Sequence, residues 1–263
     1  MRRLLLTSNG IRNEALRSAL AGLVGKPFAK ASVAVISTAP GGAGGDHDRL
    51  ADDLDRLRGL GWRKLDTLDL NSLPAATVID RLWQVDVIYA GGDNPYLLAN
   101  SIIANGLDGR LAEILESKVW VGAGAGSMIF SGFLSRETGE AFGDHDELRV
   151  LGEAPACSPF GLFNWYVEPR LNAADFPGRT PERVEQVAAK ASFPVYALDD
   201  DSAIRVRGDK SDVVSEGQWL LLNAPYSHAF GGTSALRPFT SERTWRLPTF
   251  RAPYQFVRRL TRR

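Results

Sequence analysis

The sequence holds little of what marks several common kinds of protein. Its single cysteine, Cys157, excludes an intramolecular disulfide, and we expect a reducing, cytoplasmic setting. Its 31 basic and 31 acidic residues cancel, whereas a dedicated nucleic-acid binder usually carries a basic excess. No apolar run approaches the roughly 20 residues of a membrane-spanning helix. We therefore expect neither a nucleic-acid partner nor a membrane partner.

Histidine is scarce as well. The chain has only His47, His145 and His228, and the first two are flanked by acidic residues in segments typical of exposed loops. His228 follows a Pro-Tyr-Ser stretch and could border a pocket. No two histidines have the H-x-x-x-H spacing of a metal site, so we expect no metal and no cofactor.

The first ten residues, MRRLLLTSNG, have the arginines and leucines with which a signal peptide begins. The apolar part is only Leu4–Leu6, which is shorter than the roughly 7–15 residues that such a segment needs. These residues instead predict a first β-strand that ends at the turn Ser8-Asn9-Gly10.

Strand-like apolar runs alternate with segments of helical spacing along most of the chain. This alternation predicts βαβ units with right-handed crossovers, and therefore a three-layer, doubly wound α/β/α fold with a mostly parallel sheet. After the first strand, the expected strands are Ser32–Ser37, Lys64–Leu70, Asp86–Ala90 and Lys118–Gly122. The expected helices are Asn13–Val24, Asp48–Leu60, Val78–Val85 and a helix from Pro95 onward.

The pattern changes beyond residue 190. Four short strands joined by tight turns predict a small antiparallel extension of the same sheet, at Val195–Leu198, Ala203–Val206, Asp212–Ser215 and Trp219–Leu222. We find no internal repeat and no linker, so we expect one α/β domain over residues 1–236. The segment 237–263 holds eight arginines and one acidic residue. It is either a solvated segment packed on or trailing from the domain, or a surface for an anionic partner.

Glycine-rich loops follow three of the expected strands, at 38–42, 91–94 and 121–128. In a doubly wound sheet the ligand site lies at the carboxyl ends of the strands. Glycine lets backbone N–H groups converge there on an anion or a developing oxyanion, although each loop could also be only a turn.

The stretch VGAGAGSM at 121–128 has the setting of a nucleophile elbow, the G-x-S-x-G turn of serine hydrolases. The position of the serine is occupied by Gly124. An elbow residue sits in a strained backbone conformation that costs on the order of 1–3 kcal/mol, and glycine adopts it without steric penalty. The turn can therefore persist without its nucleophile.

Five stretches in this order resemble the dipeptidase E (aspartyl dipeptidase) family: MRRLLLTSNG, AGGDNPYLL, GAGAGSM, and the later FNWYVEPRL and YALDDDSAIRV. The resemblance covers most of residues 1–205. It implies a serine peptidase on a fold related to class I glutamine amidotransferases, with cyanophycinase as a relative.

Carried over residue by residue, the resemblance implies a degenerate catalytic triad. The nucleophile position is Gly124, and the histidine that follows a proline is replaced by Arg170. The acidic member falls near Glu140, with Glu137, Asp144 and Asp146 as other candidates. Glycine cannot form an acyl-enzyme, and arginine has no acceptor atom and a pKa above about 12, so it cannot act as a general base.

The resemblance also implies a remnant binding site. The oxyanion donors correspond to the backbone N–H groups of Gly92 and Ala125, beside Asp93 and the start of the next helix. Arg170 either grips a carboxylate of a ligand or fills the vacated space and pairs with Glu168 or a nearby aspartate. Ser127 is expected at the helix start or lining the pocket, with a nucleophilic role as the alternative.

Three functions remain open from the sequence. The first is a pseudoenzyme that keeps the peptidase fold and a pocket for a small acidic molecule or peptide. The second is an active serine-type dipeptidase that cleaves Asp-X dipeptides with a rearranged nucleophile. The third is a glutamine-amidotransferase-like interaction module, which the fold permits but no residue specifically supports.

Overall fold

The computed structural model describes residues 1–38, 46–224 and 245–246 of the chain. Its strands are β1 Arg3–Thr7, β2 Ser32–Ile36, β3 Lys64–Leu68, β4 Val87–Ala90, β5 Val119–Ala123, β6 Tyr166–Glu168, β7 Val195–Leu198, β8 Ser202–Arg207, β9 Lys210–Ser215, β10 Trp219–Leu222 and β11 Trp245–Arg246. Its helices are α1 Glu14–Val24, α2 Asp46–Gly59, α3 Ala75–Trp83, α4 Pro95–Ala104, α5 Asp108–Ile114, α6 Ala125–Met128, α7 Arg136–Phe142, α8 His145–Leu151 and α9 Pro181–Ala188, with a 3-10 turn at Phe28–Lys30. The expected strands and helices of the first 123 residues are all present, with ends that shift by a few residues.

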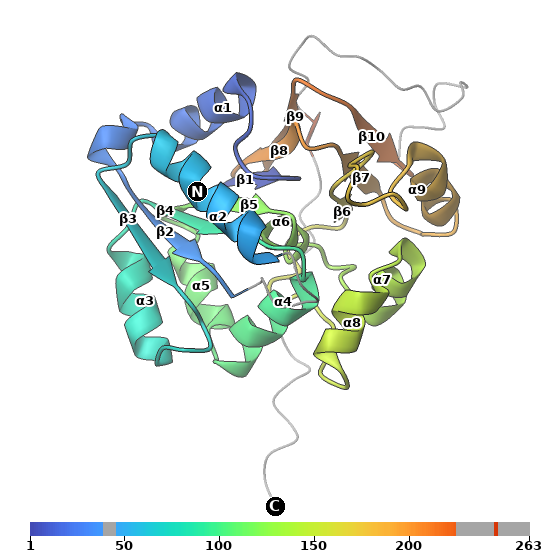
Figure 1. Cartoon of the computed structure of the whole chain (residues 1–263), viewed down its shortest axis with the longest axis horizontal. Helices are drawn as coiled ribbons and strands as arrows, with labels where there is room; N and C mark the ends of the chain where they lie inside the picture. Colours follow the sequence, from blue (N-terminus) through green and yellow to red (C-terminus); the bar gives the residue numbers. More distant parts are fainter. Residues whose placement is uncertain (39–45, 225–244, 247–263) are drawn as a thin grey trace, which may run out of the picture.

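An eight-stranded sheet in the order β11-β9-β8-β1-β5-β4-β2-β3 runs through the molecule (Figure 1). The strands from β1 to β3 in this order pair in parallel, while β8, β9 and β11 add on in antiparallel fashion. β1 is central: Leu4 pairs with Trp120 of β5 on one side and with Val206 of β8 on the other. The predicted doubly wound, mostly parallel α/β fold is confirmed.

The apolar run of β1 explains why both faces of the sheet are covered. Its side chains alternate between faces, so Leu4 and Leu6 join one hydrophobic core and Leu5 joins the other. The core around Leu5 is formed with α1 and α2, and the core around Leu4 with α3, α4 and α5 (Figure 1). The three layers are therefore helices, sheet and helices.

Two of the four short strands after residue 190 do not extend the main sheet as predicted. β8 and β9 do so, but β7 and β10 join β6 in a separate sheet of order β10-β7-β6. β6 and β7 pair in parallel, and β10 pairs with β7 in antiparallel fashion. Strand spacing and turns fix the strands themselves, but not which sheet accepts each of them.

The segment 237–263 lies outside the described residues except for β11, whose main chain pairs with β9. The arginine surface expected there, and a pocket role for His228, therefore stay predictions. The small second sheet contributes Val195, Leu198 and Leu220 to the same core as Leu4. Within the described part of the chain, no helix is both long and apolar enough to cross a membrane.

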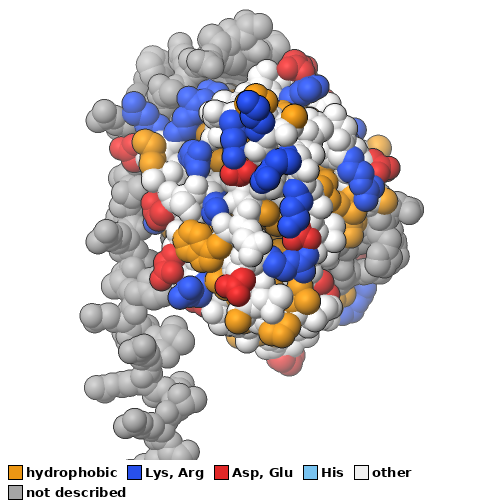
Figure 2. All heavy atoms as spheres, turned by 90° about the vertical axis from the view of Figure 1, so that its left-hand side faces the viewer, with side chains coloured by type: hydrophobic (Ala, Val, Ile, Leu, Met, Phe, Trp, Pro, Cys, Tyr) orange, Lys and Arg blue, Asp and Glu red, His pale blue; other side chains and the backbone are white. Residues whose placement is uncertain are grey.

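The far edge of the sheet is formed by β3, which alternates charged and apolar residues. Lys64 is exposed and Asp66 is half-buried on this strand. On this side of the molecule, basic and acidic side chains are interspersed, with scattered apolar ones between them (Figure 2). Charged residues on an edge strand discourage pairing with a second chain.

The helix starts next to the sheet's carboxyl edge are fixed by local capping. Asn13 accepts a hydrogen bond from the Leu16 N–H before α1, and Asn94 accepts one of 2.8 Å from the Leu97 N–H before α4. Pro95 then occupies the first turn of α4, where a missing N–H costs nothing. These caps hold the loops after β1 and β4 in place.

The two central strands end where the chain turns to opposite faces. After β1 the chain enters α1 on one face, and after the neighbouring β5 it enters α6 on the other. Such a switch point leaves a crevice at the carboxyl ends of the strands. The candidate functional site, described in the next subsection, lies at this edge of the sheet.

Close packing of α6 against β4 requires glycine at position 126. A Cβ atom at Gly126 would overlap the carbonyl oxygen of Ala90. We predict that Gly126→Ala lowers the free energy of unfolding by about 3 kcal/mol, because a main-chain oxygen cannot move aside as a side chain does. Gly109→Ala on α5, where a Cβ meets nothing within 4 Å, is the matched control and should change it by less than about 1 kcal/mol. Urea unfolding measures both, and equal losses would contradict this account.

Candidate functional site

A small cleft that opens to solvent lies at the carboxyl edge of the main sheet. Its walls come from the end of β1, from α2, from the loop after β4, from the turn after β5 and from the residue that follows Pro169. The lining residues are Ser8, Asn9, Arg49, Leu50, Asp53, Gly91, Gly92, Asp93, Ala123, Gly124 and Arg170. Gly92, Asp93, Gly124 and Arg170 were predicted site residues, and the cleft brings them together.

The turn between β5 and α6 has the geometry of an elbow. Gly124 has φ 55° and ψ −111°, a conformation that residues with a side chain rarely adopt. Its N–H donates to the carbonyl oxygens of Thr7 at 3.2 Å and Ser8 at 3.0 Å, which ties the elbow to the end of β1. Position 124 therefore lies at the floor of the cleft with no side chain to present.

The two predicted oxyanion donors are not assembled as expected. The Ala125 N–H donates a 2.8 Å hydrogen bond to the carbonyl oxygen of Gly92. This N–H is therefore not available to bind a ligand. A Cβ atom at Gly124 would lie 2.6 Å from that same oxygen. Gly92 has φ 124°, a backbone conformation that favours glycine. The Gly92 carbonyl therefore stands where an elbow side chain would begin.

Ser127 and Ala125 do not line the cleft. The Ser127 hydroxyl donates to the Thr7 carbonyl at 2.8 Å, and its side chain is buried. α6 has only four residues, so the expected contribution of a helix N-terminus is small. Ser127 thus acts as a structural link between α6 and β1.

Arg170 is buried in the cleft wall and paired with aspartates. Its Nη1 lies 3.2 Å from Asp200 Oδ2, and its Nη2 lies 3.8 Å from Asp93 and 3.9 Å from Asp175. Its backbone has φ 67° and its N–H donates to the Ser8 hydroxyl at 2.8 Å. The ion pair with Glu168 that the sequence left open is not formed. Burial of a guanidinium is favourable only with such partners.

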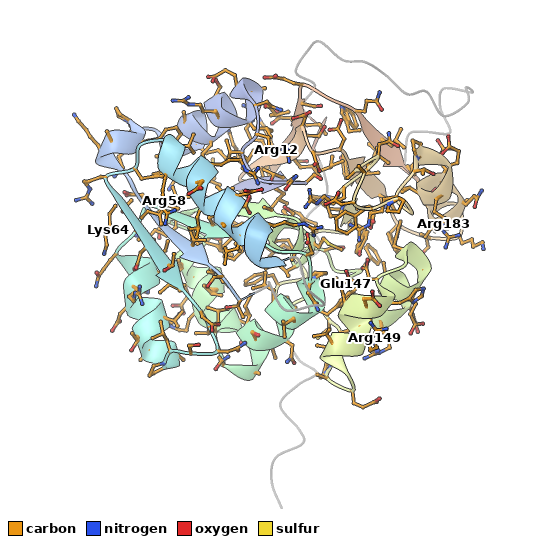
Figure 3. The ribbon with its side chains drawn as sticks, viewed as in Figure 1. Arg12, Arg58, Lys64, Glu147, Arg149 and Arg183 are labelled. Atoms are coloured by element: carbon orange, nitrogen blue, oxygen red, sulfur yellow. The ribbon has the colours of Figure 1, made fainter. Side chains whose placement is uncertain are left out.

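A second arginine reaches the same carboxylates from α2. Arg49 donates to Asp93, and its Nη2 donates to Asp175 Oδ2 at 3.0 Å. Arg12, which is labelled in Figure 3 and lies in the chain between β1 and α1, has its Nη1 3.4 Å from Asp200 Oδ2. Three arginines and three aspartates thus interlock around the mouth of the cleft, with no net charge.

The arginines also share an aromatic partner. The guanidinium carbons of Arg49, Arg170 and Arg179 lie 5.1, 5.2 and 4.7 Å from the centre of the Phe176 ring. Such contacts contribute about 0.5–1 kcal/mol each at exposed sites. Phe176 therefore joins the cleft to the buried charges behind it.

On the α2 side, Asp53 is held by Tyr89 and Arg56. The Tyr89 hydroxyl donates to Asp53 Oδ2 at 2.6 Å, and Arg56 donates to Oδ1 at 2.9 Å. Burial, followed by the Asp53 charge, raises the pKa of Tyr89 well above its usual value. Tyr89 stays a neutral donor and fixes this wall.

Of the four candidates for the acidic triad member, Asp144 alone is buried. Glu137, Glu140 and Asp146 are exposed. Asp144 accepts hydrogen bonds of 2.8 Å from the Tyr96 hydroxyl and of 2.8 Å from Arg179. It belongs to the charge cluster behind Phe176.

That cluster contains a fully buried carboxylate, Glu168. Arg179 Nε lies 2.8 Å from its Oε1, yet neither carboxylate oxygen has a partner in hydrogen-bond geometry among the described residues. Burial raises the pKa of Glu168 to about 8, and Asp144 and Glu147 act in the same direction while Arg179 opposes them. Among the described residues, no group of histidine, cysteine and acidic side chains could hold a metal ion.

The layered sheet and the elbow at its carboxyl edge together define an α/β/α protein whose cleft is built on a nucleophile-elbow turn. Residues 4–214 match peptidase family S51, and the chain belongs to this family. This confirms the resemblance drawn from the sequence motifs.

The individual relatives are distant. A probable alpha-aspartyl dipeptidase of Drosophila melanogaster is 24% identical over 159 residues, which cover 60% of this chain and 62% of that protein, less than two thirds of its length. A putative peptidase E protein from Listeria monocytogenes EGD-e superposes with a TM-score of 0.67 at 18% identity, over 82% of this chain and 100% of the other. A peptidase from an acI-B1 actinobacterium gives 0.67 and 18%, over 93% and 97%. The two structures share the fold.

The sequence reading missed part of the cleft. Ser8 and Asn9 were assigned only to a turn, and Arg49 and Asp53 only to a helix. The spacing of Arg49 and Asp53, four apart on an amphipathic helix, was the available signal. Asp175 and Asp200 gave none that distinguishes them from other loop aspartates.

The Glu168 carboxyl predicts a pH dependence of stability. Its pKa rises from the usual 4.5 to about 8 on folding, so the folded protein binds more protons between these values and the free energy of unfolding falls as pH rises through this window. This difference in the free energy of unfolding is on the order of a few kcal/mol, and Glu168→Gln should remove it. Urea unfolding near pH 5 and near pH 8 measures it, with exposed Glu140→Gln as the charge-matched control. Parallel pH profiles for the wild type and Glu168→Gln would contradict the assignment.

Proposed function

We propose that this chain lacks the serine-triad hydrolysis of its family and that its cleft binds a small acidic molecule or the acidic end of a peptide. The observation that carries the proposal is Gly124. The elbow tip has no side chain, and the Gly92 carbonyl occupies the adjacent space. No acyl-enzyme can form at such a position.

The rest of the cleft offers no replacement for the catalytic pair. Its described lining contains no histidine and no lysine, and Arg170 cannot accept a proton at ordinary pH. Ser8 is its one hydroxyl group, and Ser8 Oγ accepts a hydrogen bond from the Arg170 N–H rather than donating to a base. These features favour binding over hydrolysis.

The charges around the cleft suit a ligand that carries both signs. Arg49 and Arg170 are planar donors that suit a carboxylate, and Asp93 and Asp200 suit an ammonium group. The N-terminal end of an aspartyl peptide carries both groups, and the name of the Drosophila relative refers to such peptides. The ligand would exchange ion-pair partners with the protein.

Hydrolysis of Asp-Leu by the purified protein is the first test, with an active aspartyl dipeptidase as positive control. We expect no release of leucine above background, and none from Gly124→Ala, because the elbow contributes no nucleophile. Turnover that survives repeated purification and is lost in Ser8→Ala or Ser127→Ala would overturn the proposal in favour of a rearranged dipeptidase.

Restoring the serine alone should not restore activity. Gly124→Ser places a Cβ at 2.6 Å from Gly92 O at a positive φ, so we expect stability to fall by about 1–3 kcal/mol without any gain in turnover. Gly124→Ala should lose a similar amount, since the penalty belongs to the Cβ. Melting curves and the Asp-Leu assay test both statements, and an unstrained, active Gly124→Ser would contradict them.

Binding is measured by titration calorimetry with Asp-Leu and with succinate. We expect Arg49→Gln and Arg170→Gln to weaken binding about tenfold or more, because hydrogen bonds to a charged group contribute about 1.5–3 kcal/mol. Arg149→Gln on α8, which lies well away from Arg12 in Figure 3, should leave it unchanged. Equal binding by all three variants would show that the cleft is not the site.

A further inference from the structure

The carboxylate of Asp175 already sits where an acidic ligand would meet the arginines. Asp175 Oδ2 lies 3.0 Å from Arg49 Nη2 and 3.9 Å from Arg170 Nη2, so one oxygen bridges two guanidinium groups. It comes from the segment 171–179, which connects β6 to α9. The cleft lining itself does not include it.

Asp175 is the most exposed of the three aspartates in the cluster. Its side chain is 46% exposed, compared with 15% for Asp93 and 27% for Asp200. A solute that arrives from solvent therefore meets Asp175 first. Asp93 is also contacted by both Arg49 and Arg170, but its side chain is less exposed.

The segment that carries Asp175 is anchored at both ends, by the Leu171 N–H on the Leu198 carbonyl and by the ion pairs of Arg179 with Asp144 and Glu168, and it forms a turn between them. It is closed at its base by the Asn172 N–H on the Arg179 carbonyl at 2.9 Å, and Ala173, Phe176 and Arg179 bond to carbonyls within the turn. Its tip meets the body through the Asp175 carboxylate and the Phe176 ring. The tip can therefore open when these side-chain contacts are replaced, while the anchored ends of the segment stay in place.

Resting on the binding function proposed above, we infer that Asp175 is an internal ligand of Arg49 and Arg170, which a carboxylate-bearing ligand must displace to enter the cleft. The exchange keeps the charge of the site unchanged, because one carboxylate replaces another. It also moves Asp175 and the loop tip away from the arginines. Affinity is then set by how often the segment is open.

Removal of the internal carboxylate tests the inference. Succinate is the probe, since it has no peptide bond and reports binding whatever the outcome of the hydrolysis assay. Asp175→Asn keeps the size of the side chain and should tighten the dissociation constant roughly threefold to tenfold, as the competitor is lost. Asp146→Asn, an exposed aspartate 2.8 Å from Arg149 on α8, is the matched control and should bind as the wild type does.

Hydrogen–deuterium exchange gives a second readout on the full chain. Succinate should speed exchange in the peptide that covers residues 171–180 of the wild type, because the ligand releases the tip. Tighter binding by Asp175→Asn together with this faster exchange supports the inference.

Two failures are distinguishable. If the wild type binds succinate and Asp175→Asn binds it equally or more weakly, Asp175 is not a competitor, and the proposed binding function stands without it. If neither protein binds succinate or Asp-Leu, the inference and the proposed function are both overturned.

Discussion

The hydrogen bond from the Ala125 N–H to the Gly92 carbonyl joins the two loops on which the cleft is built. It closes the gap between the ends of β4 and β5, and the missing Cβ of Gly124 leaves room for the Gly92 carbonyl that accepts it. The N–H of Gly124 reaches β1 at the same point, so three neighbouring strands end in one rigid unit. At this turn, main-chain hydrogen bonds join the ends of neighbouring strands to one another.

The second constraint is charge balance in a partly buried place. Arg170 is nearly enclosed, and an unpaired guanidinium there would be strongly destabilising. Asp93, Asp175 and Asp200 each come from a different loop, so the ion pairs also fix how those loops meet. Phe176 extends the arrangement toward Arg179 and Asp144, where Glu168 lies in an excess of buried negative charge. Under the proposed binding function, a charged ligand would have to replace an ion-pair partner that is already present.

Most of the fold could be predicted from sequence because it depends on local pattern. Leu4–Leu6 and the run at Ser32–Ile36 read as buried strands, and Asn13 and Pro95 mark helix starts, since period and capping are properties of neighbouring residues. The sheet to which β7 and β10 belong could not be predicted, because strand partners are chosen by packing across long distances in the chain.

The candidate site could also be predicted only in part from the sequence. Gly124 and Arg170 could be selected because they stand at marked positions in motifs, and both lie on the cleft. The engagement of the Ala125 N–H could not, since it depends on the orientation of one peptide group that no residue type encodes. Pairing of Arg170 with a nearby aspartate was one of the alternatives that the sequence left open, but which aspartates take part depends on three loops that only the tertiary fold brings together.

The glycine at the elbow also bears on the evolutionary history open to this chain. A single nucleotide change turns some glycine codons into serine codons, so a serine at position 124 arises repeatedly by mutation. In this backbone the Cβ of that serine would meet the Gly92 carbonyl at 2.6 Å at a positive φ, and under the proposed function no base would stand beside it. Selection therefore meets the loss of stability before any gain in chemistry. The packing of the Gly92 carbonyl against Gly124 therefore favours keeping glycine at position 124.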